Sequence, residues 1–197
     1  MKNRVPRLAA GLLAALCAAL LAACGGSDGA SGEAAKPPSA AETGTAVTRL
    51  AEAPPALRQN AADANKLAGE GLRGLKARLA KLEGHPVVVN LWASWCGPCR
   101  AEFPFFADAV VEHGDKVAFL GIDFNDDRDS ANDFLEEVPP GFASIYDPDG
   151  AAVRSLGGGR VAPSTFFIGR DGRRVYTKLG GYPDAKALEA DIRRYAL

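Results

Sequence analysis

The stretch of sequence that decides the fold is PVVVNLWASWCGPC, residues 86–99. It begins with a continuous apolar run rich in β-branched side chains, which is typical of a strand buried on both faces of a sheet. Two cysteines follow, with Gly97 and Pro98 between them. Because proline favours the first turn of a helix, we expect a helix from about Pro98 onward. The Cys96-x-x-Cys99 pair therefore stands where a buried strand is followed by a helix.

This position favours thiol-disulfide chemistry. The unpaired backbone N–H groups and the dipole at a helix N-terminus stabilise a thiolate relative to a thiol. Gly97 carries no side chain that could cover the sulfur of Cys96. We expect Cys96 to attack a partner disulfide and Cys99, one turn further into the helix, to resolve the mixed disulfide. Both cysteines are therefore predicted to be catalytic.

Other uses of the cysteine pair fit the sequence less well. A zinc site needs four ligands, and the remaining candidates are His85 and His113, with no second Cys-x-x-Cys pair. A purely structural disulfide would close too small a loop to constrain the unfolded chain much. We therefore expect no metal and no cofactor. We also expect both histidines to be solvated at the borders of helices or strands.

Strand and helix patterns alternate along the rest of the chain. Leucines at positions 72, 75, 79 and 82 recur at three- and four-residue steps, which predicts an amphipathic helix that ends at Gly84. Further expected elements are a helix to residue 113, a strand at 117–124, a helix at 126–137, a strand at 143–146, a hairpin of strands at 164–169 and 173–179, and a helix at 184–195. The acidic run at 126–129 lacks the twelve-residue loop of a calcium site and is interpreted as a helix start. The pattern predicts an α/β fold in which helices flank a mixed central sheet.

The chain begins with the pattern of an export signal. Three basic residues lie within positions 1–7, and an apolar run of 16 residues follows at 8–23. This run is shorter than the roughly 20 residues of a membrane-spanning helix, so cleavage is expected. It ends in Leu-Ala-Ala-Cys24, which resembles the lipobox of bacterial lipoproteins and implies lipid attachment to Cys24. Cleavage by an ordinary signal peptidase, or retention of the segment as an anchor, would also place the rest of the chain outside the cytoplasm.

Composition and charge limit the possible number of domains and the possible classes of partner. The 197 residues, 47% of them hydrophobic, suffice for one core with appendages. Residues 24–50 are rich in small and polar side chains, which predicts a disordered tether before a domain at 51–197. The formal net charge of −1 excludes the basic footprint of nucleic-acid binding. We expect a monomer that reaches the membrane only through its lipid.

Residues 92–99 resemble the active site of the thioredoxin superfamily. The sequence CRAEFP at 99–104 narrows the resemblance to the TlpA- and ResA-like branch, and VAPSTFFI at 161–168 extends it. The resemblance covers about 72–195. It implies a thioredoxin-like fold with a strand-helix unit, here 126–146, inserted between the active-site helix and a cis-proline. Pro163 matches that cis-proline, which shapes the groove for substrate backbone.

The resemblance also implies roles for individual residues. A glutamate three positions after the second cysteine assists proton transfer to the resolving thiol, and Glu102 matches it. Asn90 stands where thioredoxin has a buried acid, so Glu102 is the candidate catalytic carboxyl; alternatively, it only favours the helix start. We expect Trp95 to shield the sulfur and Trp92 to lie in the core. The expected substrate groove comprises Trp95, Gly97, Pro98, Ala162 and Pro163.

The resemblance implies an exported thiol-disulfide oxidoreductase, with exported protein thiols or disulfides as substrates and a membrane electron donor or acceptor as partner. Reduction of disulfides, including those of apocytochrome c, is the leading hypothesis, and an exported oxidase is the near alternative. A copper-delivery module would use both sulfurs as Cu(I) ligands, but Met1 is the only methionine. A peroxidase of the same superfamily would need a separate Thr-x-x-Cys element.

Overall fold

The computed structural model describes residues 48–159 and 161–197. The signal peptide expected at 1–23, Cys24 and most of the tether lie outside these residues. Within the described part of the chain, no helix is both long enough and apolar enough to cross a membrane.

A six-stranded mixed sheet forms the centre of the domain, with the strand order β1-β4-β3-β2-β5-β6. Strands β1, β4, β3 and β2 pair in parallel, whereas β5 and β6 are antiparallel to their neighbours. The strands are β1 (Leu67–Glu70), β2 (Val87–Trp92), β3 (Ala118–Phe124), β4 (Ala143–Asp147), β5 (Ser164–Ile168) and β6 (Arg174–Leu179). Every residue of β2 and β3 is buried, as expected for central strands. The predicted mixed sheet, with β2 directly before the cysteine pair, is confirmed.

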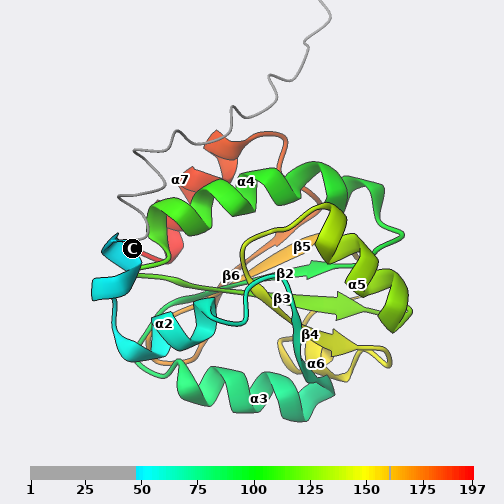
Figure 1. Cartoon of the computed structure of the whole chain (residues 1–197), viewed down its shortest axis with the longest axis horizontal. Helices are drawn as coiled ribbons and strands as arrows, with labels where there is room; N and C mark the ends of the chain where they lie inside the picture. The colour runs from blue at the N-terminus through cyan, green and yellow to red at the C-terminus, as the bar shows by residue number, and fades with distance from the viewer. Residues whose placement is uncertain (1–47, 160) are drawn as a thin grey trace, which may run out of the picture. The chain divides into compact units, whose positions relative to one another are not determined.

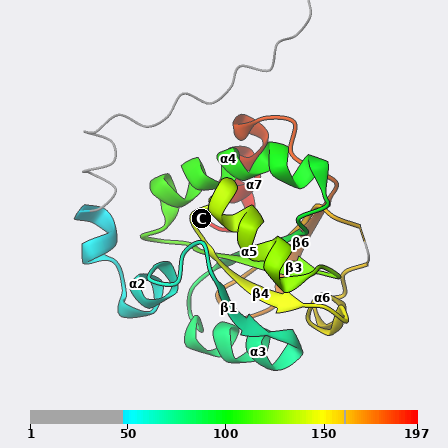
Figure 2. The same cartoon turned by 45° about the vertical axis from the view of Figure 1, so that its right-hand side comes forward.

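Helices cover both faces of the sheet (Figures 1 and 2). One face carries α4 (Gly97–His113), α5 (Arg128–Glu137) and α7 (Ala185–Tyr195), whose buried side chains share one apolar cluster. The other face carries α2 (Pro55–Ala61), α3 (Gly71–Lys81) and α6 (Ala151–Ser155). The thioredoxin-like fold that the sequence predicts is therefore present.

Aromatic packing fixes α4 on the sheet. The Trp92 ring, fully buried on β2, lies 5.5 Å from the ring of Phe103 on α4 and 5.3 Å from that of Phe134 on α5. Phe103 and Phe134 are 5.2 Å apart, so the three rings close a triangle. Burying one such side chain stabilises the fold by about 1.5–3 kcal/mol. The core position expected for Trp92 is confirmed, and the cluster fixes the start of α4.

The short elements α2, β1 and α6 escaped the sequence analysis. Helix α6 has five residues, too few to show a helical period. Its start is stabilised instead by Asp147 at the end of β4, whose carboxylate accepts hydrogen bonds from the backbone N–H groups of Ala152 at 2.9 Å and Val153 at 3.0 Å. Strand β1 is four residues long and lies at an edge of the sheet, where only half-buried side chains are required.

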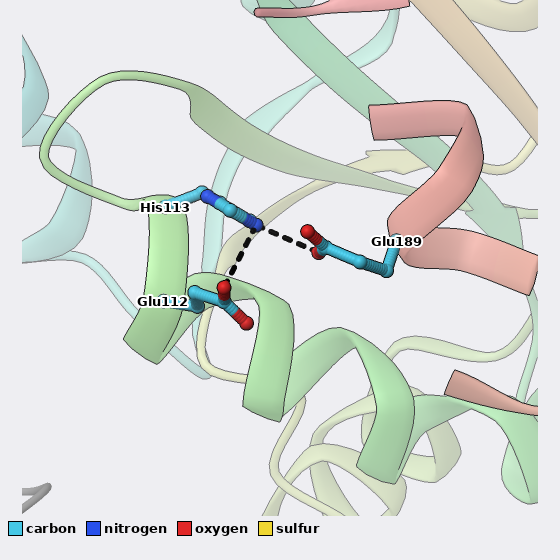
Figure 3. Close-up of side chains that lie close together, drawn as sticks. All are labelled: Glu112, His113 and Glu189. Carbon is cyan, nitrogen blue, oxygen red and sulfur yellow. Dashed lines mark hydrogen bonds and ion pairs between the residues drawn. The ribbon is translucent and has the colours of Figure 1, made fainter. Parts of the chain in front are cut away.

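The solvated position expected for His113 is wrong. Its side chain is buried in the last turn of α4, and Nε2 lies 2.7 Å from a carboxylate oxygen of Glu189 on α7 (Figure 3). Glu112 approaches the same nitrogen at 3.8 Å. Arg193 forms ion pairs with both Glu112 and Glu189. Its guanidinium group therefore already balances part of the negative charge of this cluster. His85 is half-buried.

Candidate active site

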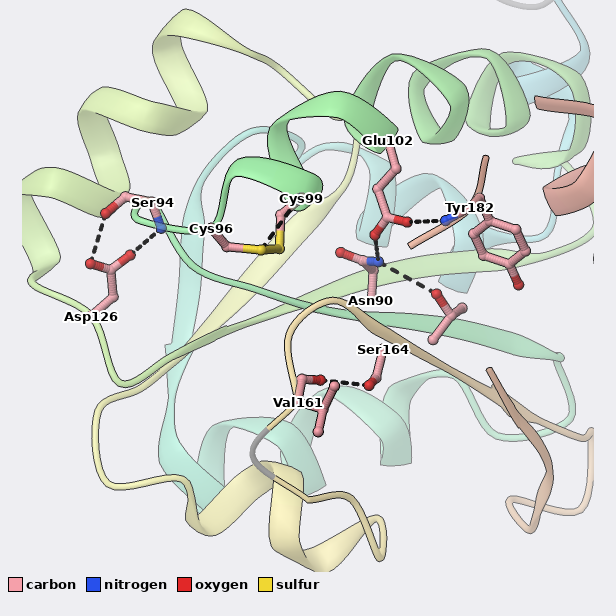
Figure 4. Close-up of a disulfide and its surroundings, with 10 residues drawn as sticks. Asn90, Ser94, Cys96, Cys99, Glu102, Asp126, Val161, Ser164 and Tyr182 are labelled. Carbon is pink, nitrogen blue, oxygen red and sulfur yellow. Dashed lines mark hydrogen bonds between the residues drawn. A yellow bond between two sulfur atoms is a disulfide. The ribbon is translucent and has the colours of Figure 1, made fainter. Parts of the chain in front are cut away.

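The two cysteines form a disulfide at the N-terminus of α4, with their Cα atoms 5.3 Å apart (Figure 4). Cys96 is the residue that caps the helix. Its sulfur accepts a hydrogen bond from the backbone N–H of Cys99 at 3.2 Å, and its carbonyl accepts from the N–H groups of Cys99 and Arg100. The backbone N–H of Cys99 therefore faces the sulfur of Cys96, where it would stabilise a thiolate, as the sequence predicts.

The two sulfurs differ in access. Cys96 is 4% exposed and Cys99 is fully buried, while Gly97 and Pro98 between them are exposed. A partner that approaches the disulfide therefore reaches Cys96 first. Trp95 is 57% exposed, and its indole N–H donates to the carbonyl of Asn125 at 3.1 Å. Its predicted shielding of the sulfur stays a prediction.

Asp126 holds the loop that precedes the cysteines. Its carboxylate accepts hydrogen bonds from both the backbone N–H and the hydroxyl of Ser94, the latter at 2.8 Å (Figure 4). The next residue, Asp127, caps α5 by accepting from the backbone N–H groups of Asp129 and Ser130. The helix-start interpretation is thus confirmed for Asp127, whereas the contact of Asp126 with the active-site loop was not foreseen.

The peptide bond between Ala162 and Pro163 is cis. The carbonyl of Pro163 accepts a hydrogen bond from the N–H of Gly180 at 3.0 Å. A Cβ atom added to Gly181 would lie 3.4 Å from Pro163, 3.4 Å from a carboxylate oxygen of Glu102 and 3.9 Å from the carbonyl of Pro98. The structure therefore brings Pro163 close to Pro98 and Glu102 of α4, which the sequence analysis selected from a distant segment. Their roles in catalysis and substrate binding stay predictions.

Glu102 is a buried carboxyl, 1% exposed, on the inner face of α4. Oε1 accepts from the side-chain amide of Asn90 at 2.8 Å, and Oε2 accepts from the backbone N–H of Tyr182 at 2.9 Å (Figure 4). Burial raises the pKa of Glu102, while these hydrogen bonds and the charge of Lys178 act in the opposite direction. Because Cys99 lies three positions earlier on the same helix and is also buried, the two side chains are neighbours.

Asp123, near the end of β3, was not singled out from the sequence. It is fully buried, and neither carboxylate oxygen has a hydrogen-bond partner within the described residues. Burial, followed by the negative charge of Asp126, raises the pKa of Asp123 to about 9. The sequence did contain a sign that Asp123 is unusual, because this acid stands within a predicted strand that is otherwise apolar. Tyr182 and Lys178 carried no such signal.

The family model described as Redoxin matches residues 58–192. This chain belongs to the Redoxin family. It is 31% identical over 132 residues to the thiol:disulfide interchange protein CycY of Rhizobium leguminosarum bv. viciae, a match over 66% of this chain and 69% of that protein. It is 32% identical over 96 residues to the thiol-disulfide oxidoreductase ResA of Oceanobacillus iheyensis, over 48% of this chain and 50% of that protein.

The crystal structure of a secreted thiol-disulfide isomerase of Corynebacterium glutamicum aligns with this redoxin at a TM-score of 0.51 and 31% identity, over 60% of this chain and 72% of that chain. The chain thus spans about half the length of the ResA relative, and a larger share of CycY and of the isomerase. The predicted resemblance to the TlpA- and ResA-like branch is confirmed. The chain is a thioredoxin-like thiol-disulfide oxidoreductase.

Proposed function

We propose that the protein is an exported, lipid-anchored thiol reductase that reduces disulfides of exported proteins through Cys96 and Cys99. The observation that carries this proposal is the asymmetry of the pair. Cys96 is the more accessible sulfur and lies against the N-terminus of α4, whereas Cys99 is fully buried behind it. The names of the relatives, which include a secreted isomerase, support thiol-disulfide exchange outside the cytoplasm.

Reduction then proceeds in two exchanges. The Cys96 thiolate attacks one sulfur of the substrate disulfide, the substrate S–S bond breaks, and the departing sulfur takes up a proton. The Cys99 thiol loses its proton to the Glu102 carboxylate and attacks the Cys96 sulfur. The mixed disulfide breaks, and the second substrate sulfur leaves as a thiolate that takes up the proton from Glu102. Two electrons have moved to the substrate, and the protein is left with the Cys96–Cys99 disulfide seen in the structure. A dithiol electron donor at the membrane would return it to the reduced state.

The same geometry supports recognition of an extended substrate segment. Three exposed apolar side chains lie close to the disulfide or the cis-proline. Trp95 precedes Cys96 in the sequence, and Val161 stands two positions before Pro163. Leu179 pairs across the β5–β6 ladder with Ser164, the residue after Pro163. An unfolded exported chain, which presents apolar residues beside its cysteines, fits this surface better than a folded polar one. Apocytochrome c, implied by the resemblance, belongs to this substrate class.

Trapping of mixed disulfides tests the roles of the two cysteines. Cys99→Ser should accumulate covalent adducts with substrate proteins, because resolution is blocked while attack by Cys96 continues. Cys96→Ser, the matched control, should accumulate few. Equal trapping by both variants would overturn the assignment.

The direction of electron transfer needs a separate measurement. For a reductase we expect a reduction potential nearer to the about −270 mV of thioredoxin than to the about −120 mV of DsbA. Equilibration of the wild-type protein with glutathione buffers, read by alkylation and mass, gives this value. A potential close to −120 mV on that scale would make the protein an oxidase and overturn the reductase proposal.

A further inference from the structure

Lys178, on β6, binds the turn that follows it. Its side chain is half-buried, and Nζ donates to the carbonyls of Leu179 at 3.0 Å, Gly180 at 3.5 Å and Gly181 at 3.3 Å. The same nitrogen lies 5.5 Å from the ring centroid of Tyr182. A single ammonium group therefore fixes three successive carbonyls and faces the next aromatic ring. Such an arrangement stabilises one conformation of the turn at 179–182.

The opposite side of this turn touches the active site. The backbone N–H of Tyr182 donates to Glu102 at 2.9 Å, and the N–H of Gly180 donates to the carbonyl of Pro163 at 3.0 Å. Gly181 lies against both residues, since a Cβ atom there would be in van der Waals contact, at 3.4 Å, with the Glu102 carboxylate and with the Pro163 ring. The turn thus connects Lys178 to the buried carboxyl and to the cis-proline.

We propose that Lys178 is a positioning residue for proton exchange at Glu102: it holds the turn that binds Glu102 and places a positive charge near the carboxylate. The inference rests on the proposed role of Glu102 in the reductase. Lys178 need not touch substrate, because it acts through the backbone of 180–182 and through its charge. A purely structural lysine would stabilise the turn without changing how Glu102 titrates.

The charged and titratable groups around Glu102 determine how strongly the charge of Lys178 affects its ionisation. Cys99 lies on the same helix face, one turn before Glu102, and Cys96 caps that helix. From the other side comes Tyr182, whose hydroxyl donates to a carboxylate oxygen of Asp191 on α7 at 2.9 Å. Asn90 on β2 is neutral. Among these neighbours, Lys178 is the positive group, so its removal should favour the protonated form of Glu102.

The test compares Lys178→Met, which removes charge and hydrogen bonds, with Lys178→Gln, which keeps a donor, and Lys178→Arg, which keeps the charge. Lys76→Met is the matched control, because Lys76 is exposed on α3 at the opposite face of the sheet. The first measurement follows the amide resonance of Tyr182 in the oxidised protein by NMR from pH 4 to pH 9. This signal reports ionisation of Glu102 without any turnover.

We expect the midpoint of the Tyr182 titration to rise by about 0.5–1 pH unit in Lys178→Met and Lys178→Gln. It should be unchanged in Lys178→Arg and Lys76→Met. The acid limb of the thiol-disulfide exchange rate should move to higher pH by the same amount. Unchanged midpoints in Lys178→Gln would overturn the proposal, even if Lys178→Met failed to fold.

Glu102→Gln separates this inference from the proposed function. It should abolish both the Tyr182 titration and the acid limb of the exchange rate, and adding Lys178→Met should cause no further shift. If Glu102→Gln exchanged disulfides at the wild-type rate, the proton-transfer role would fail. The shift of the Tyr182 midpoint is measured separately, in the Lys178 variants that retain Glu102. A failure of the proton-transfer role can therefore be distinguished from a failure of the role of Lys178.

Discussion

The backbone N–H of Tyr182 donates a hydrogen bond to Glu102 at 2.9 Å, although the two residues are 80 positions apart in the sequence. Because the donor belongs to the backbone, only proline at position 182 would remove it. The second hydrogen bond to this carboxyl comes from Asn90 on the central strand β2. Glu102 is therefore oriented by the fold itself, beside the resolving cysteine of its own helix.

Glu102→Gln should slow thiol-disulfide exchange while leaving the fold intact. A positioned acid or base contributes typically about 10²–10⁴-fold to a rate, and the amide cannot exchange a proton with Cys99. Stopped-flow reduction of a model disulfide between pH 5 and pH 9 measures the loss. Glu136→Gln, at an exposed position of α5, is the control. A normal rate together with a stability loss of about 0.3–1 kcal/mol would instead indicate a helix-start role.

The part of the site that lies within one segment could be predicted from the sequence. The cysteine pair, the strand before it and the helix after it are specified by local residue types and by the turn between them. Glu102 and Pro163 were selected through family resemblance, and the structure places both of them next to Gly181. Glu102 and Pro163 come close together because β2 pairs with β5. This pairing joins distant segments, so no local sequence pattern predicts it.

The residues that escaped prediction act through long-range packing. Lys178 and Tyr182 reach the site because β6 continues the sheet beyond β5 and its final turn runs past Glu102. His113 was misplaced because its position near a helix end suggested solvent. It lies on the same face of α4 as Phe103 and Phe106, and α7 covers that face.

Cys24 is predicted to be the first residue of the mature protein and to carry lipid. The basic start, the 16-residue apolar run and the small residues before Cys24 motivate this prediction. Intact mass of the protein extracted from membranes should correspond to a chain that begins at Cys24 with acyl groups attached. Cys24→Ala should lack the acyl mass and should no longer be processed at position 24. A mature chain with another first residue, or protein free in the medium, would contradict the prediction.

Asp126→Asn should loosen the loop before the cysteines. The carboxylate accepts two hydrogen bonds from Ser94, and an amide has only one oxygen with which to accept them. Loss of a buried or half-buried bond of this kind costs about 1–3 kcal/mol. We expect a lower melting temperature and faster amide hydrogen exchange at Ser94. Asp129→Asn, exposed in the first turn of α5, should lower the melting temperature less, through the helix dipole alone, and should leave hydrogen exchange at Ser94 unchanged; equal effects of the two substitutions would argue against a specific anchor.

Asp123 should make the stability of the oxidised protein depend on pH. Its pKa rises from an ordinary 3.8 to about 9 in the fold, chiefly through burial and then through the charge of Asp126. Since the folded-state pKa is the higher one, the stabilisation is complete below the unfolded value and is lost as pH rises towards about 9. One group changes the free energy of unfolding by at most about 1.4 kcal/mol per pH unit.

Asp123→Asn removes this titration while keeping a neutral side chain of similar shape. The free energy of unfolding of the wild type should therefore fall relative to that of the variant between pH 5 and pH 8, as measured by urea unfolding of the oxidised proteins. The disulfide keeps both active-site cysteines from titrating in this experiment. Parallel curves for wild type and variant would show that Asp123 is ionised throughout. In an Asp126→Asn background the difference should shrink, because removing that negative charge lowers the pKa of Asp123 and narrows the pH window over which stability is lost.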